Sequence, residues 1–264
     1  MIVIHMTTVQ TVFAIVSGGL VGFTLGLIGG GGSILAVPLL LYVVGIHDAH
    51  VVIGTTALAV AVNAFINLIS HWRAGHVRWK AAILFAIPGA IGAVGGSVLG
   101  KMVDGKALLF LFAILMLVIA VKMLRTKQQG EPDMRKQNIK MGRVLGTGAA
   151  TGIVSGFFGI GGGFLIVPGL MFATGMIMIE AIGSSLLSVG AFGLTTAVSY
   201  AISGLVDWWV FVLYVIGGIV GGVGGTLLSS RLGKNKRALQ VIFSVIIIVV
   251  AAYMLYDNLL AFHW

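Results

Sequence analysis

Hydrophobic and polar positions follow one another along this chain in long blocks, with extended apolar runs separated by short polar stretches. Apolar runs of about 18 or more residues can cross a bilayer as helices and are too long for the core of a small soluble domain. A transmembrane β-barrel would show alternating segments of roughly ten residues, a pattern that is missing here. The blocks therefore predict an all-α polytopic membrane protein.

The apolar runs divide into five segments in each half of the chain, and the second segment of each half is short. About thirteen residues of helix rise only about 20 Å, less than the roughly 30 Å hydrocarbon core, so the glycine-rich turn before each short segment should lie inside the membrane. The expected segments are 8–28, 33–45, 51–71, 79–100 and 106–124, then 141–160, 164–175, 180–201, 208–230 and 237–256.

The two halves carry the same motifs. When the chain is slid along itself, "GLIGGGGSILAVPLLL" (26–41) falls on "GFFGIGGGFLIVPGLM" (156–171), and "IGTTAL" (53–58) falls on "IGSSLL" (182–187) at nearly the same offset. We interpret 1–124 and 141–264 as two copies of one transmembrane repeat, joined by a basic linker, 125–140.

The basic residues indicate how the repeats are oriented. If the first two segments of each half enter and return on one side, a single face carries fourteen of the sixteen Lys and Arg, in the loops 72–80 and 231–237 and the linker. The positive-inside rule then places this face in the cytoplasm, inverts the second repeat relative to the first and leaves both termini outside the cytoplasm. The net charge of +9 reflects topology and anionic headgroups, so we expect no nucleic-acid partner.

Two glycine-rich turns, "GGGGS" (29–33) and "GIGGG" (159–163), carry the candidate chemistry. Each is expected to be non-helical backbone that opens a short helix, whose first amides lack intrahelical partners and favour an anion. In inverted repeats the two turns would meet near the midplane and address one site. Close helix packing is the alternative explanation for most of the 40 glycines, including the run 217–225.

Short polar side chains follow each turn and offer donors without a fixed charge, although hydroxyls of this kind also bond to carbonyls of their own helix. The candidate substrate-binding residues are Gly30, Gly31, Gly32, Ser33, Thr55, Thr56, Asn63, Gly161, Gly162, Gly163, Ser184 and Ser185.

Ionisable side chains within the apolar segments are few. The chain has no cysteine, no nucleotide-binding GxxxxGK[ST] motif and no converging set of acidic and histidine residues inside the bilayer, so we expect neither an enzyme nor a bound cofactor or metal. His50 and Glu180 begin corresponding helices. An interfacial position in a wet loop is the alternative explanation for both, and Glu180 is the better candidate of the two for relaying protons or binding a cation.

The duplicated glycine motifs and the "IGTTAL" and "IGSSLL" stretches resemble the sulfite exporter TauE/SafE family of membrane transporters over nearly the whole chain. The resemblance implies transport of small sulfur-containing anions, such as sulfite or organosulfonates, across the cytoplasmic membrane. By position it points to Gly31–Ser33 and Gly161–Gly163. Ile160 replaces the second glycine in the second copy, and Gly163 stands where the first has Ser33, so the two halves of the site are not equivalent.

We therefore expect a secondary transporter, acting as an exporter, in which one repeat rocks against the other. An anion channel stays open as an alternative, as does a cation or metal transporter that uses Glu180 and unwound carbonyls. The expected partners are the small anion, the lipid bilayer and a coupling ion, either proton or sodium. A homodimer is left open.

Overall fold

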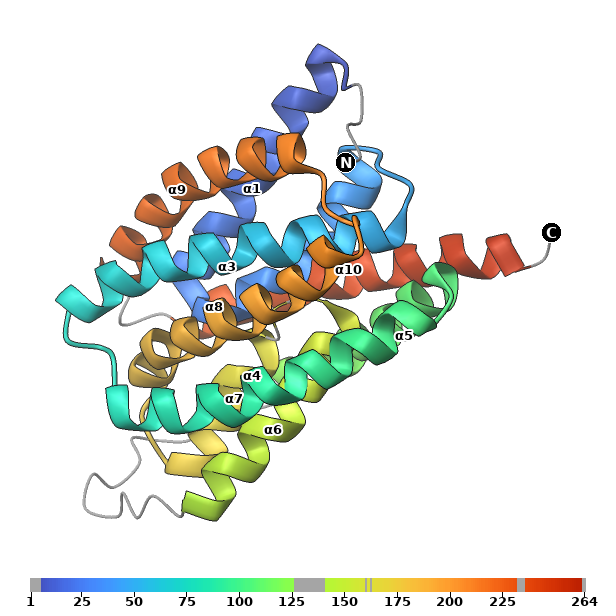
Figure 1. The fold of residues 1–264 in the computed structure, drawn as a ribbon. Coiled ribbons are helices and arrows are strands. Elements are labelled where there is room, and N and C mark those ends of the chain that lie inside the picture. Colours follow the sequence, from blue (N-terminus) through green and yellow to red (C-terminus); the bar gives the residue numbers. More distant parts are fainter. Residues whose placement is uncertain (1–5, 126–140, 160, 162, 232–235, 263–264) are drawn as a thin grey trace.

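The computed structural model describes residues 6–125, 141–159, 161, 163–231 and 236–262, and in this part of the chain it contains helices and no strands (Figure 1). The basic linker lies almost entirely outside the described residues. Each of the ten expected segments corresponds to helical structure. The elements are α1 (Thr8–Ile28), η1 (Gly29–Leu35), α2 (Ala36–Pro38), η2 (Leu39–Val43), α3 (Ala49–Arg73), α4 (Trp79–Met102), α5 (Gly105–Arg125), α6 (Met141–Phe158), α7 (Gly163–Thr174), α8 (Met178–Ile202), α9 (Trp208–Arg231) and α10 (Lys236–Phe262).

The described helices include six stretches that are long and apolar enough to cross a membrane, each with large apolar side chains facing outward. The prediction of an all-α polytopic membrane protein is confirmed. These stretches are Thr8–Val43, Ala49–Arg73, Trp79–Met102, Gly105–Lys122, Met178–Ile202 and Trp208–Ser229.

The first two segments of each half form a hairpin that returns to the side where it began. At the open end of the first hairpin, Nε2 of Gln10 donates a hydrogen bond to the carbonyl of Val44 at 3.2 Å, which joins the start of α1 to the end of the short run η1–α2–η2. In the second half the guanidinium of Arg143, near the start of α6, lies 5.3 Å from the ring centroid of Phe172, near the end of α7. A short segment therefore runs back along the long one in both halves.

Helices of the first half pack against helices of the second half. In Figure 1, α1 of the first half crosses α9 of the second, and α4 of the first half packs in the same way on α6 of the second. At both crossings glycines four residues apart leave no room for a Cβ, because the facing backbone is in direct contact. The contacts are reciprocal between corresponding positions of the two copies: Gly18–Tyr214, Gly22–Gly218 and Gly26–Gly222 in one crossing, and Gly148–Phe85, Gly152–Gly89 and Gly156–Ala93 in the other.

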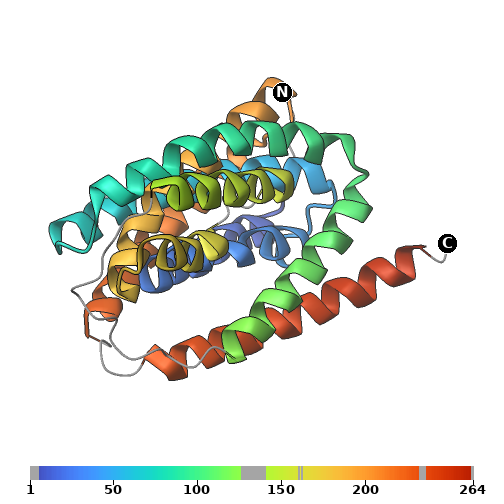
Figure 2. The ribbon, with the colours of Figure 1, turned by 90° about the horizontal axis from the view of Figure 1, so that it is seen from below.

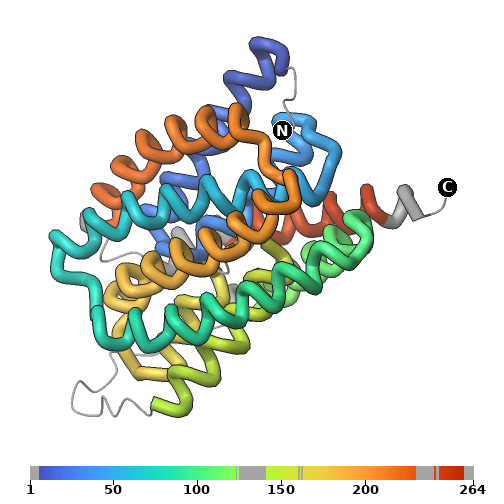
Figure 3. The backbone as a smooth tube through the Cα atoms, viewed as in Figure 1, coloured from blue at the N-terminus to red at the C-terminus, as the bar shows by residue number. Residues whose placement is uncertain are grey.

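The remaining helices complete the arrangement. The tube in Figure 3 shows α3, from the first half, and α8, from the second half, side by side at the centre. Seen from below, α5 and α10 pair with each other on one flank of the molecule (Figure 2). Each helix in the pairs α1–α9, α4–α6, α3–α8 and α5–α10 therefore packs on a helix of the other half. The residues closest to the centre come from α3, α8 and the two glycine turns.

Candidate functional site

The two glycine turns contact each other near the centre of the molecule. A Cβ placed on Gly30 would collide with the backbone of Gly163, and one placed on Gly163 would collide with the carbonyl of Gly30. The amide of Gly30 donates a hydrogen bond to Oγ of Ser185 in α8 at 3.3 Å. Three of the sequence-predicted site residues, one from each turn and one from α8, thus come together here.

The first turn differs from its expected form. We expected non-helical backbone over 29–33, but these glycines form the tight helix η1, in which Oγ of Ser33 donates to the carbonyl of Gly30 at 2.9 Å. Consecutive glycines can adopt this compact winding because they have no side chains to crowd at every third position. Only Gly29, with φ of 70°, has the left-handed conformation that reverses the chain after α1.

The second turn is closer to the expectation. Gly159 and Gly161 have φ of 66° and 65°, and the short helix α7 begins at Gly163. Its remaining candidate, Gly162, lies outside the described residues. The sequence difference between the copies, which places Gly163 where the first has Ser33, thus accompanies a difference in backbone conformation.

Reciprocal contacts hold both turns in place. Gly29 packs against Ile182 of α8, and its counterpart Gly159 packs against Ile53 of α3. Gly161 lies between Val60 and Val189, where a Cβ would be 3.3 Å and 3.5 Å from their Cγ1 atoms. These two valines occupy corresponding positions in the two halves of the sequence, so Gly161 contacts the same position of α3 and of α8.

Packing or backbone conformation explains most turn glycines, but not Gly31. A Cβ on Gly30, Gly32 or Gly163 would collide with backbone. By contrast, a Cβ on Gly31 would meet, among the described residues, only the side chain of Ile28, at 3.1 Å, and Gly31 has no positive φ. The residue is nevertheless buried. Gly31 is therefore the turn glycine that neither a backbone contact within the described residues nor a positive φ accounts for.

The first hydroxyl of each "TT" or "SS" pair holds a loop of the other half. Oγ of Ser184 accepts a hydrogen bond from the amide of Arg78 at 2.8 Å, and Oγ1 of Thr55 accepts one from the amide of Asp207 at 2.9 Å. Arg78 and Asp207 occupy corresponding positions in the two copies. Both hydroxyls act as acceptors in these bonds, so their O–H groups remain available to donate.

The second hydroxyl of each pair is engaged within its own helix. Thr56 donates to the carbonyl of Val52 at 2.7 Å, and Ser185 donates to the carbonyl of Ile182 at 2.8 Å. A hydroxyl has one proton to donate. Ser185 therefore serves the turn as the acceptor for Gly30, and Thr56 and Ser185 are weaker candidates for donating to an anion than Thr55 and Ser184.

Asn63 is fully buried in α3 and faces α9. Its side-chain amide lies against the backbone of Gly218, where a Cβ would collide with it, and neither amide atom has a hydrogen-bond partner among the described residues. At the reciprocal position stands Phe192, packed against Gly89 and stacked on Phe85 with ring centroids 6.4 Å apart. The same place in the two halves is thus polar in one and aromatic in the other.

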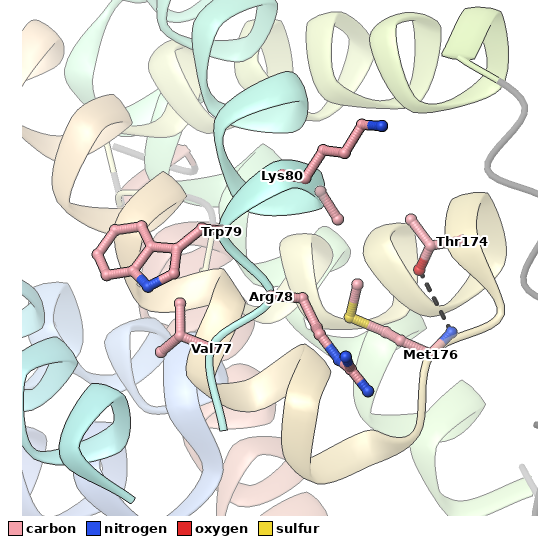
Figure 4. A pocket seen from close by; sticks show the side chains of 7 residues that line it. Val77, Arg78, Trp79, Lys80, Thr174 and Met176 are labelled. Carbon is pink, nitrogen blue, oxygen red and sulfur yellow. Dashed lines mark hydrogen bonds between the residues drawn. The ribbon is translucent and has the colours of Figure 1, made fainter. Parts of the chain in front are cut away.

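A cross-half ion pair lies at the end of the molecule where α4 begins. Nη2 of Arg78 and Oε1 of Glu180 are 2.6 Å apart, and the hydrogen bond and charge of Glu180 raise the pKa of the Arg78 guanidinium above its ordinary value. Sequence reasoning singled out Glu180 but did not find its partner, because nothing in the spacing of residues 102 positions apart links them. Arg78 also lines a pocket of about 290 Å³, together with Val77, Trp79, Lys80, Ala81, Thr174 and Met176 (Figure 4).

Comparison with known proteins fits this architecture. The family model for sulfite exporter TauE/SafE matches residues 14–254, which span both halves, both glycine turns and the Arg78 pocket. The chain belongs to the sulfite exporter TauE/SafE family.

Similar proteins carry a transporter name. A probable membrane transporter protein of Xylella fastidiosa strain Temecula1 is 51% identical over 255 residues, covering 96% of this chain and 98% of that protein. The probable membrane transporter protein YunE of Bacillus subtilis is 25% identical over 91% of this chain and 96% of its own length. A probable membrane transporter protein of Haemophilus influenzae is 28% identical over 90% and 95%. No solved structure gives a significant match.

Membership in this TauE/SafE family and the apolar helices together make the chain a multi-pass protein of a membrane transporter family. The glycine turns that carried the resemblance in the sequence are among the segments through which the two halves contact each other.

Proposed function

We propose that this TauE/SafE protein is a secondary transporter that exports a small sulfur-containing anion, such as sulfite or an organosulfonate, across the cytoplasmic membrane. The observation that carries the proposal is Gly31, a buried turn glycine that neither packing against the described residues nor a positive φ accounts for, one residue from the contact between the two turns. An anion at this point would approach backbone amides closely and would meet no fixed negative charge.

The two repeats are inverted in this proposal. Two observations support the inversion: the first two segments of each half form a hairpin that returns to its starting side, and three long helices follow in each half. A hairpin plus three crossings carries the chain to the opposite face, so the second half would start from that face. The basic face would be cytoplasmic by the positive-inside rule, and both termini would lie outside the cytoplasm.

Reciprocal helix exchange supports alternating access. The rigid crossings α1–α9 and α4–α6 each join one half to the other through glycines in backbone contact, so neither half is an independent rigid body. The two crossings would instead rotate against each other about the turns and the pair α3–α8. Such rocking would expose the central site to one side and then to the other.

An anionic substrate is favoured over a cation. Glu180, the acidic side chain on which a cation site would rest, is already paired with Arg78 at 2.6 Å. The neutral donors of Thr55 and Asn63 suit an anion whose charge is delocalised over several oxygens. The test below separates a carrier from a channel, because only a carrier shows saturation and counterflow.

The test uses purified protein in proteoliposomes and radiolabelled sulfite, with sulfate as the comparison anion and with imposed pH or sodium gradients. We expect saturable sulfite flux that one gradient accelerates, and loss of that flux in Gly31→Leu. Gly95→Leu is the matched control, because a side chain at Gly95 meets nothing within 4 Å among the described residues. Flux that Gly31→Leu leaves intact in a folded variant would contradict the site, and unsaturable flux without counterflow would indicate a channel.

A further inference from the structure

The Arg78 pocket lies between residues 77–81, where a loop leads into the first turn of α4, and residues 174–176, at the end of α7. The two segments come from different halves of the chain. Its volume of about 290 Å³ exceeds that of a small oxyanion many times over, and two cationic side chains, Arg78 and Lys80, stand on its rim. Figure 4 shows Arg78 extending from the loop before α4, and Lys80 from the start of α4, toward different sides of the pocket, with Met176 and Thr174 on the facing wall.

The Arg78 guanidinium is bound by the carboxylate of Glu180, whose second oxygen has no hydrogen-bond partner among the described residues. The side chain of Glu180 is 12% exposed, that of Arg78 is 50% exposed, and Oε2 of Glu180 is buried without a hydrogen-bond partner in the described part of the chain. A guanidinium has five N–H donors, so one bond to Oε1 leaves others free to receive a second anion. Because the Arg78 side chain is half-exposed, an anion from solvent can reach these donors and compete with Glu180 for them.

The loop that carries Arg78 is fixed independently of the ion pair. The amide of Arg78 donates to Oγ of Ser184 at 2.8 Å, and the carbonyl of His76 packs directly on Gly183. The backbone therefore stays docked on α8 when the guanidinium changes partner. The Arg78 side chain can therefore bind a different anion while the backbone of the loop stays in contact with α8.

The opposite end of the molecule repeats this docking with the charges changed. There the amide of Asp207 donates to Thr55, and the carbonyl of Leu205 packs on Gly54. The carboxylate of Asp207 stands where the first half has Arg78, and it accepts hydrogen bonds from the amides of Trp209 and Val210 at 2.9 Å.

Other charged groups also stand at that end, including the cations Lys101 and Lys106 and the carboxylates Asp48 and Asp104. His50 stands where the second half has Glu180, and its ring centroid lies 6.3 Å from that of Tyr200. Nζ of Lys101 is bound to the carbonyl of Ser199 at 2.9 Å and to Oγ of Ser203 at 3.0 Å. At this one corresponding position, an arginine thus stands at one end of the molecule and a carboxylate at the other.

We propose that the Arg78 pocket captures the substrate oxyanion at the basic face: the anion takes the guanidinium of Arg78 from Glu180, and passage ends at the opposite face, where the carboxylate of Asp207 replaces this arginine. This inference rests on the proposed function, because it names the end at which the transported anion enters. Capture at Arg78 and release past Asp207 would set the order of the two sites in an export cycle, and the coupling gradient would drive net flux outward.

Calorimetric titration of detergent-purified protein with sodium sulfite at low ionic strength tests capture without requiring transport. We expect Arg78→Gln to weaken binding about tenfold or more, because it removes charge-assisted bonds to the oxyanion. Glu180→Gln should tighten binding about threefold, because the competing carboxylate is gone. Arg73→Gln, which removes the same charge on the same face, is the control; an equal loss in this variant would assign the effect to general surface charge and overturn the proposal.

Two further arms complete the test. The double exchange Arg78→Glu with Glu180→Arg keeps an ion pair and should abolish sulfite binding; sulfite binding retained by this variant would overturn the assignment. Repeating the titration in nanodiscs with and without phosphatidylglycerol separates a free oxyanion from a lipid phosphate, and loss of sulfite binding with the anionic lipid would identify the lipid headgroup as occupant. If Gly31→Leu abolishes sulfite flux but Arg78→Gln binds sulfite as tightly as the parent protein, capture at Arg78 is refuted and the proposed function still stands.

Discussion

Ser184 of α8 accepts a hydrogen bond from the main-chain amide of Arg78 at 2.8 Å, across the boundary between the two halves of the chain. Thr55 of α3 does the same for Asp207 at 2.9 Å. Each bond satisfies an amide next to the first turn of a long helix, α4 or α9, where the helix itself supplies no acceptor. The central helices α3 and α8 thus cap the helices of the opposite half.

Loss of this cap should destabilise the protein. We expect Ser184→Ala to lower the free energy of unfolding by about 1–3 kcal/mol, because it leaves a partly buried amide without an acceptor. Ser188→Ala, one turn further along α8, is the matched control: Oγ of Ser188 has no partner among the described residues, so its removal should cost little. Thermal unfolding in one detergent measures both, and equal melting temperatures for the two variants would contradict the capping role.

Glycine packing at the crossing of α4 and α6 gives a second prediction. A Cβ on Gly96 would collide with the carbonyl of Ile153, whereas a Cβ on its neighbour Gly95 meets nothing within 4 Å among the described residues. We expect Gly96→Ala to destabilise the protein by about 1–3 kcal/mol through overpacking. Gly95→Ala should be neutral or slightly stabilising, because alanine is the better helix former by up to about 1 kcal/mol.

The comparison of these adjacent glycines is best made by unfolding in a single detergent, where lipid contacts are equal. If Gly95→Ala lowers the free energy of unfolding more than Gly96→Ala does, the helices at this crossing are not packed as closely as the geometry indicates. The same pair of variants also reports on transport, since a crossing that must stay rigid during rocking should lose flux along with stability.

Apolar block length predicted the helices, because crossing a bilayer imposes a length that sequence records directly. The span expected at 79–100 is Trp79–Met102, and the one expected at 180–201 is Met178–Ile202. The pairing of helices was not predictable, since "GGIVGGVGG" (217–225) indicates a close neighbour without indicating which one. Only the fold assigns Gly218 to Gly22.

The candidate site was predicted in composition more than in detail. The duplicated turns led to Gly30 and Gly163, which do meet, but four consecutive glycines fit an unwound loop and the tight helix η1 equally well, so the conformation over 29–33 was missed. The roles of Ser184 and Ser185 also differ, because adjacent residues on a helix point about 100° apart toward different neighbours. Their common motif conceals one cap for Arg78 and one acceptor for Gly30.

The turn glycines give a third prediction that separates packing from ligand access. Gly30→Ala should impair folding or destabilise strongly, because its Cβ would collide with the backbone of Gly163. Gly31→Ala should fold with a melting temperature near that of the parent, because only Ile28 would have to adjust. Fluorescence-monitored size-exclusion profiles and melting curves of the two variants provide the measurement. A Gly31→Ala protein as unstable as Gly30→Ala would return Gly31 to packing and remove the main support for the anion site.

Asn63 gives the last prediction, in which stability and transport should move in opposite directions. Its buried amide has no partner among the described residues, and an unsatisfied buried polar group typically costs about 1–3 kcal/mol. Asn63→Leu replaces the amide by an apolar side chain of similar size, so we expect the melting temperature to rise or stay unchanged. Sulfite flux should fall, because a neutral donor on the proposed path is lost.

Phe192, the reciprocal residue, is the control for this prediction. It packs on Phe85 and Gly89 in an apolar setting, so Phe192→Leu should lower stability through lost packing. Any decline in flux should then track the amount of folded protein. A stabilised Asn63→Leu protein that keeps full flux would show that the unpartnered amide is not used in transport, whereas stabilisation with loss of flux would mark it as a polar group retained for function at the expense of stability.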